Sequence, residues 1–372
     1  SSSDKLYTVQ LLHSLSLTPS FHKLILHFAS PTTNDSPLTM TFFNVYSQET
    51  RDAHHGATIS AGSPEIDNLV NEIYSAAAGF GTDENRLTQA LGNRTTRERY
   101  LISARYPELH KKSLLDEIKG ETSGDYGKAL ELLAQPLEDA EASIVRDATK
   151  GSGTNEDLLY PIFGGRSNDE LAILKKAFFQ KYQEDLVVVI ADDIGGDLKK
   201  VYLAALNSFA QAYDPSIHPR HKAEEVAEAI YKAGEGKWGT DESAFVNALY
   251  SVPSEFLPAV DAAYKAKHNH GLIVAIEKEF TGDAERALKF HVQIQLNAVE
   301  TVANHIESTL KGIGTDEYGL TAAIVRYASI LPQVAQAYKA KHGKDLRERI
   351  HGETSGDFGK VLLVVYDRAL RH

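Results

Sequence analysis

A short glycine–threonine loop recurs four times in this chain of 372 residues, and an acidic residue follows each copy about 40 positions later. The glycine that ends each loop is Gly81, Gly153, Gly239 or Gly314. The acids that follow are Glu121, Asp193, Glu279 and Glu353; the fourth pair is one residue shorter than the others. Self-similarity at a period of 72 to 86 residues predicts an array of four related modules rather than one irregular domain.

Apolar residues recur at helical spacing within every module and keep their register relative to the acid. Three positions before each acid lies an isoleucine, namely Ile118, Ile190, Ile276 and Ile350. Seven positions before it lies a leucine, namely Leu114, Leu186, Leu272 and Leu346. This pattern predicts an all-α fold with about five helices per module, in which each module buries its apolar face against its neighbours. We expect Pro107 to end the third helix of the first module and Pro161 to kink or shorten the second helix of the second.

The spacing divides the chain into a tail, four modules and a linker. We assign the tail to residues 1–61, module 1 to 62–134, module 2 to 135–213, a linker to 214–222, module 3 to 223–297 and module 4 to 298–372. Two prolines in the linker account for the longest interval. Residues 1–39 contain few acids and precede the first methionine, Met40, so a transit peptide, an added extension and a wrongly assigned start are the alternatives for them. Residues 40–62 are expected to be flexible.

Composition excludes several classes of function. The net charge of −12 argues against nucleic-acid binding, which requires clustered basic residues. It also predicts repulsion from an anionic membrane unless a cation intervenes. The chain has no cysteine, which removes thiol and disulfide chemistry and fits a cytoplasmic protein. No apolar stretch approaches the roughly 18 residues of a membrane-spanning helix.

The recurring loop has the chemistry of half a calcium site. Calcium accepts six to eight oxygen ligands, many of them backbone carbonyls, and glycine permits the turns that point successive carbonyls at one ion. The distant acid would complete the site with a carboxylate. The simpler interpretation is a glycine that ends one helix and a threonine that begins the next, with Thr82, Thr154, Thr240 and Thr315 as caps. Four aligned acids favour the calcium interpretation.

The longer motifs resemble the annexin family over residues 62–372. The segments that carry the resemblance are Ile118–Asp125, Ala233–Glu242 and Ile350–Asp357. The resemblance implies four five-helix repeats stacked into a slightly curved disc, with calcium sites on the convex face. It also implies calcium-dependent binding to acidic phospholipid membranes by a cytoplasmic, peripherally associated protein.

The resemblance also implies a ligand set by position. Its members are backbone carbonyls and one carboxylate per module: Ala77, Gly79, Gly81 and Glu121; Thr149, Gly151, Gly153 and Asp193; Gly234, Lys237, Gly239 and Glu279; Leu310, Gly312, Gly314 and Glu353. The single tryptophan, Trp238, lies inside the module 3 loop. An indole suits a membrane interface, so Trp238 is predicted to contact lipid after calcium drives it outward, the alternative being a core position.

Other functions remain open at this stage. The 15 histidines lack an HExxH pattern or cysteine partners, so we expect surface histidines and no enzyme. A helical-repeat scaffold or cytoskeletal adaptor would explain the core register but not the four acids. A calcium-regulated, ion-conducting annexin is the remaining alternative, and a protein that binds the tail is possible.

Overall fold

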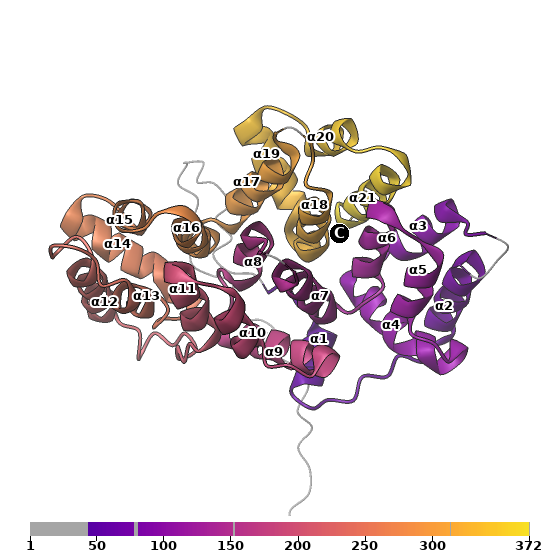
Figure 1. The fold of residues 1–372 in the computed structure, drawn as a ribbon, viewed down its shortest axis with the longest axis horizontal. Coiled ribbons are helices and arrows are strands. Elements are labelled where there is room, and N and C mark those ends of the chain that lie inside the picture. Colours follow the sequence, from indigo (N-terminus) through magenta and orange to yellow (C-terminus); the bar gives the residue numbers. More distant parts are fainter. Residues whose placement is uncertain (1–43, 78–80, 152, 313, 372) are drawn as a thin grey trace, which may run out of the picture. The chain divides into compact units, whose positions relative to one another are not determined.

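The computed structural model describes residues 44–77, 81–151, 153–312 and 314–371, and every regular element in these ranges is a helix (Figure 1). The predicted all-α fold class is therefore confirmed. Each of the four modules contains five α-helices, as the periodicity predicted. None of the described helices combines the length and the apolar character needed to cross a lipid bilayer.

The helices of the two N-terminal modules follow one plan. Module 1 comprises α2 (Pro64–Ala77), α3 (Glu84–Gly92), α4 (Thr96–His110), α5 (Leu114–Glu121) and α6 (Gly124–Leu133). Module 2 comprises α7 (Leu137–Thr149), α8 (Glu156–Phe163), α9 (Asn168–Tyr182), α10 (Leu186–Asp193) and α11 (Gly196–Leu206). In both modules the acid is the last residue of the fourth helix.

The two C-terminal modules repeat this plan and add a short 3₁₀ turn before the third helix. Module 3 comprises α12 (Arg220–Ala233), α13 (Glu242–Leu249), η1 (Ser254–Phe256), α14 (Leu257–His268), α15 (Leu272–Glu279) and α16 (Gly282–Leu296). Module 4 comprises α17 (Ala298–Leu310), α18 (Glu317–Arg326), η2 (Ala328–Ile330), α19 (Leu331–His342), α20 (Leu346–Glu353) and α21 (Gly356–Ala369).

The expectation that Pro107 ends a helix was wrong, whereas a kink at Pro161 stays a prediction. Helix α4 continues through Pro107 to His110, and the Lys111 amide donates to the Pro107 carbonyl at 3.0 Å. Helix α8 contains Pro161 and still has eight residues, as many as α13. Proline removes one backbone donor from a helix, and tertiary packing can outweigh that loss when the side chains around it are buried.

The register positions form the core. The isoleucine three positions before each acid and the leucine seven positions before it are no more than 1% exposed in all four modules. Burying each such side chain stabilises the fold by about 1.5–3 kcal/mol. The buried side chains form two clusters, one drawn mainly from modules 1 and 4 and the other mainly from modules 2 and 3. Helix α21 packs against α3 and α6, while α11 packs against α13 and α16.

The segment before module 1 was expected to be flexible, but its described part is built into the fold. Helix α1 (Gln48–His54) begins at Ser47, whose hydroxyl accepts from the Thr50 amide at 3.2 Å. The Val45 amide donates to the Glu170 carboxylate at 3.2 Å, and the Thr50 hydroxyl donates to Glu138 at 3.1 Å. Residues 44–54 therefore attach to module 2. The expectations for residues 1–39 lie outside the described residues.

Candidate metal centre

The recurring loop folds back across the end of the first helix in every module. In each case the residue after the loop threonine donates its backbone N–H to a carbonyl in or next to the last turn of that helix. The pairs are Asp83 with Ala76 (3.0 Å), Asn155 with Ala148 (2.9 Å), Asp241 with Ala233 (2.7 Å) and Asp316 with Thr309 (2.9 Å). Ala77, Thr149 and Leu310 are the final residues of their helices, where carbonyls lack partners within the helix.

The loop glycines adopt a backbone conformation that other residues avoid. The φ angles are +98° at Gly81, +100° at Gly153, +76° at Gly239 and +94° at Gly314. A Cβ atom at any of these positions would meet no other atom within 4 Å, so the dihedral angle, not lack of space, requires glycine. Gly151 and Gly312 share the conformation, at +120° and +136°. Gly79 lies outside the described residues.

The structure brings the loop and the distant acid together in all four modules. The loop threonine hydroxyl donates to the acid residue each time, to its carboxylate in modules 2 and 3 and to its backbone carbonyl in modules 1 and 4. The pairs are Thr154 with Asp193 (2.6 Å), Thr240 with Glu279, Thr82 with Glu121 (3.0 Å) and Thr315 with Glu353 (3.2 Å). The predicted pairing of loop and acid therefore appears as a hydrogen bond.

The threonines do not cap the following helices, which corrects the sequence expectation. The N-caps are one residue later, at Asp83, Asn155, Asp241 and Asp316. The three aspartates accept a backbone N–H from the first turn, at 2.9–3.0 Å. The glycine turn leaves the threonine one position too early to cap, and its hydroxyl is then available to the acid. The sequence carried a signal for this, because each threonine is followed by Asp or Asn, which cap helices better than threonine does.

Module 3 shows how closely the acid approaches the loop. A Cβ atom at Gly234 would lie 2.9 Å from Cγ of Glu279, so the carboxylate side chain occupies the space that glycine leaves. The Lys237 amide donates to the Gly234 carbonyl at 3.1 Å. A carboxylate together with backbone carbonyls is the kind of oxygen donor set that calcium prefers. Among the described residues, no three His, Cys, Asp or Glu side chains cluster as metal ligands, and a site made mainly of carbonyls does not need them.

Comparison with known proteins agrees with this arrangement. The annexin family model matches four stretches of the chain, residues 69–133, 138–205, 225–289 and 301–365. The chain belongs to the annexin family. Annexins are calcium-dependent phospholipid-binding proteins. Each matched stretch covers most of one five-helix module, so the recurrence seen in the sequence is the annexin repeat.

Individual annexins resemble the chain over nearly all of its modules. Mouse annexin A13 is 33% identical over 317 residues, which cover 85% of this chain and 97% of that protein. The structure of annexin III superimposes with a TM-score of 0.75 at 29% identity, covering 82% of this chain and 95% of that one. Calcium-bound annexin (Sm)1 shares the fold, with a TM-score of 0.71 at 23% identity, over 84% and 98% of the two chains.

In one module of this annexin a basic side chain contacts both the loop and the acid. In module 4 the Arg349 guanidinium donates from Nη2 to the Leu310 carbonyl at 2.7 Å and from Nη1 to the Glu353 carboxylate. Both acceptors belong to the ligand set expected for that module. Sequence reasoning missed this contact, although an arginine four residues before the acid on one helix was a visible signal.

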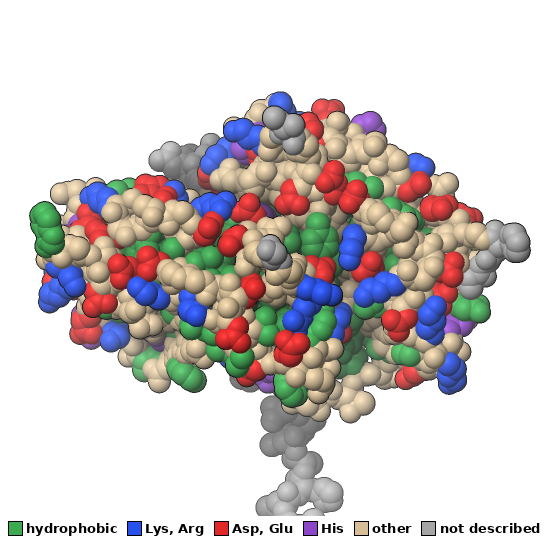
Figure 2. Space-filling view, in the orientation of Figure 1, with side chains coloured by type: hydrophobic (Ala, Val, Ile, Leu, Met, Phe, Trp, Pro, Cys, Tyr) green, Lys and Arg blue, Asp and Glu red, His purple; other side chains and the backbone are tan. Residues whose placement is uncertain are grey.

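Trp238 is fully exposed, with an accessible area 102% of the reference value, so the core alternative is wrong. Its indole already stands outside the protein, and no outward movement is needed for it to reach a membrane. Because Gly239 turns the chain with positive φ, the tryptophan lies at the tip of the module 3 loop. Figure 2 shows acidic and basic side chains interspersed over the face that it draws, with no broad area of one charge.

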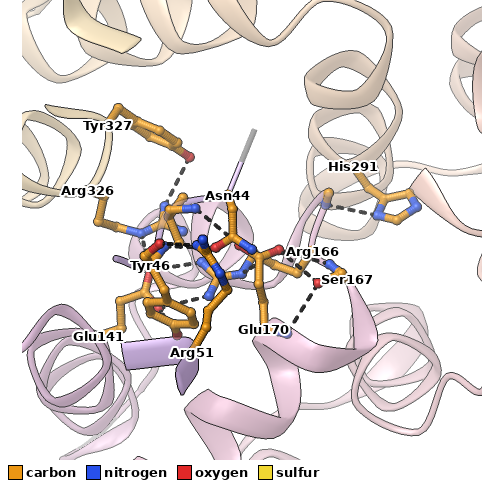
Figure 3. Close-up of polar contacts among 12 residues, drawn as sticks. Asn44, Tyr46, Arg51, Glu141, Arg166, Ser167, Glu170, His291, Arg326 and Tyr327 are labelled. Carbon is orange, nitrogen blue, oxygen red and sulfur yellow. Dashed lines mark hydrogen bonds and ion pairs between the residues drawn. The ribbon is translucent and has the colours of Figure 1, made fainter. Parts of the chain in front are cut away.

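A second polar cluster of this annexin is buried and lies away from the loops (Figure 3). Glu141 accepts hydrogen bonds from both Nη atoms of Arg166, at 3.0 and 3.2 Å, and from Arg326 Nε at 2.5 Å. The Tyr46 hydroxyl donates to the same carboxylate, and its ring lies 4.6 Å from the Arg166 guanidinium carbon. Burial raises the pKa of Glu141, but the two arginines beside the carboxylate hold that pKa below its ordinary value. These partners satisfy the buried charge, which makes the cluster a structural element joining modules 2 and 4.

Proposed function

We propose that this annexin binds acidic phospholipid membranes in the presence of calcium through the loop–acid pairs of its modules. The observation that carries the proposal is the hydrogen bond between loop threonine and acid in all four modules. The bond reaches the carboxylate in modules 2 and 3 and the backbone carbonyl of the acid residue in modules 1 and 4. It supports a loop and an acid residue acting as one unit, which a plain helix stop and start would not require.

The residues that would hold calcium are carbonyl and carboxylate donors at the loops. They are Ala77, Gly79, Gly81 and Glu121 in module 1, Thr149, Gly151, Gly153 and Asp193 in module 2, and Gly234, Lys237, Gly239 and Glu279 in module 3, with Leu310, Gly312, Gly314 and Glu353 as the corresponding set in module 4. Calcium, when bound, supplies positive charge and open coordination positions for lipid phosphate oxygens.

The charge of the protein explains why binding would depend on the ion. At −12 the chain is repelled by an anionic lipid surface, and each ion held at a loop adds two positive charges there. Sites that leave positions open for lipid have weak affinity for free calcium, on the order of 10⁻⁵ to 10⁻³ M. Several loops engaging one membrane would then bind through avidity. Trp238 would place its apolar ring in the interface.

This proposal places the protein in the cytoplasm, peripherally attached to membranes when calcium rises. It assigns a binding role and no enzymatic activity. A helical-repeat scaffold or cytoskeletal adaptor predicts no response to calcium, and an ion-conducting annexin predicts a calcium-dependent conductance. The four threonine–acid pairs favour membrane binding over both.

Sedimentation with vesicles tests the proposal. With phosphatidylserine-containing vesicles, the protein should pellet in millimolar calcium and return to the supernatant when excess chelator is added. Vesicles of phosphatidylcholine alone are the control and should pellet much less protein. Equal pelleting with anionic vesicles in excess chelator would show that the loop–acid sites do not mediate binding.

A further inference from the structure

Module 4 differs from the other modules in having a basic side chain between its loop and its acid. Arg349 lies on α20, one helical turn before Glu353, and its guanidinium reaches across to the end of α17. There it donates to the Leu310 carbonyl at 2.7 Å, and its Nε lies 3.6 Å from the Glu307 carboxylate. On its own helix it donates to Glu353. One cation therefore contacts oxygens of both halves of the module 4 site.

The corresponding positions in the other modules cannot make this contact. Four residues before the acid lie Glu117 in module 1, Val189 in module 2 and Ala275 in module 3. Valine and alanine carry no charge. Glu117 carries the opposite charge and pairs with Lys112 at 3.3 Å. Of these four positions, only the one in module 4 carries a guanidinium.

Its surroundings hold the guanidinium in place. The Arg349 side chain is 16% exposed, whereas the Glu353 side chain is 37% exposed, so the arginine is the more enclosed partner. An arginine guanidinium stays charged at every physiological pH. An arginine fork makes several directed hydrogen bonds at once, which fixes its position between the two elements.

We propose that the Arg349 guanidinium takes the place of calcium in module 4, so that this annexin binds three calcium ions through its loop–acid sites, in modules 1, 2 and 3. The inference rests on the proposed function. Unlike the threonine hydroxyls of modules 2 and 3, the guanidinium sets a positive charge against the Leu310 carbonyl and the Glu353 carboxylate that an ion would need. Repulsion between a divalent ion and a fixed cation a few ångströms away weakens calcium binding by at least about tenfold.

The same argument says what the arginine does for the module. It neutralises Glu353 and links α17 to α20 without calcium, so the module 4 loop is closed at resting calcium concentrations. An ion pair whose acid is partly exposed contributes little to stability. Its main effect is therefore on calcium stoichiometry.

Counting bound calcium tests the inference. Equilibrium dialysis of the full chain with radioactive calcium and phosphatidylserine-containing vesicles should give three ions per chain. Arg349→Met keeps a long side chain, removes the charge and should give four. Arg347→Met is the matched control, because Arg347 lies on the same helix and pairs with Asp367 at 2.7 and 2.9 Å, away from the loop. It should leave the count at three.

A double variant identifies the fourth site. Adding Glu353→Gln to Arg349→Met should return the count to three, because the new ion loses its carboxylate. Circular dichroism of each variant verifies that the helices persist. Four ions in the unchanged protein, or three in Arg349→Met, would overturn the inference. An absence of calcium binding in every variant, the unchanged protein included, would instead overturn the proposed function.

Discussion

Trp238 is the residue that reports most directly on membrane contact. It is the only tryptophan, and its side chain is fully exposed at a loop tip. Calcium alone should leave its fluorescence at the wavelength of a water-exposed indole. Calcium together with phosphatidylserine-containing vesicles should shift the emission to the blue, because the ring then enters a less polar environment. A fluorescence titration with each addition made separately measures this.

The control for this experiment is Glu279→Gln, which removes the charged ligand of the same module and leaves Trp238 in place. At limiting calcium the variant should show a smaller blue shift than the unchanged protein. Emission that stays red with vesicles and saturating calcium would mean that the module 3 loop does not carry the indole into lipid.

At the residue scale, the sequence identified the loop glycines and the acids but not all of the contacts that they and their neighbours make. Glycines and acids are recognisable because their spacing recurs four times. The role of Thr240 was misread, because its hydroxyl suits both a helix cap and the Glu279 carboxylate, although Asp241 directly after it is the better cap. Arg349 was missed because its effect depends on the end of α17, which lies 39 residues earlier in the chain and comes near only in the fold.

At the scale of elements, the segment that carries α1 is held by polar contacts with modules 1 and 2. Tyr46 is buried, and its hydroxyl donates to Glu141 between two arginines. Tyr46→Phe should lower the free energy of unfolding by about 1.5–3 kcal/mol, the range for a hydrogen bond to a charged group. Urea denaturation measures the change. Tyr213→Phe, at a largely exposed position, is the control and should have an effect near zero.

If Tyr46→Phe left the stability unchanged, the hydrogen bond to Glu141 would have no net energetic value in this cluster.

The element scale also shows where sequence rules fail. Pro107 did not end α4, which continues for three more residues to His110. The contacts of α1 had no periodic signal at all, since a seven-residue helix is too short to show one.

At the scale of the whole molecule, stability should depend on pH through a carboxyl group between α1 and module 2. Burial raises the pKa of Glu138 to about 7. At pH values between the ordinary pKa of glutamate and 7, Glu138 carries a proton in the folded protein but not in the unfolded chain. The free energy of unfolding therefore falls as pH rises through this window. From pH 5 to 8, the free energy of unfolding should fall by about 1–3 kcal/mol relative to that of Glu138→Gln.

Denaturant unfolding of both proteins at several pH values measures this difference. The glutamine variant serves as its own reference, because every other titrating group is common to the two chains. A difference that stayed constant or grew with pH would show that Glu138 is ionised in the folded protein throughout.

The pairing of module 1 with module 4 in one core affects how the chain must be made. Module 1 leaves the ribosome before modules 2 and 3, and α21, whose side chains cover α3 and α6, follows only after them. Until then the apolar face of module 1 stays uncovered, while modules 2 and 3 can complete their shared core. Exposed apolar surface on a nascent chain is prone to aggregation. We therefore expect the nascent chain to be most prone to aggregation before α21 has been synthesised.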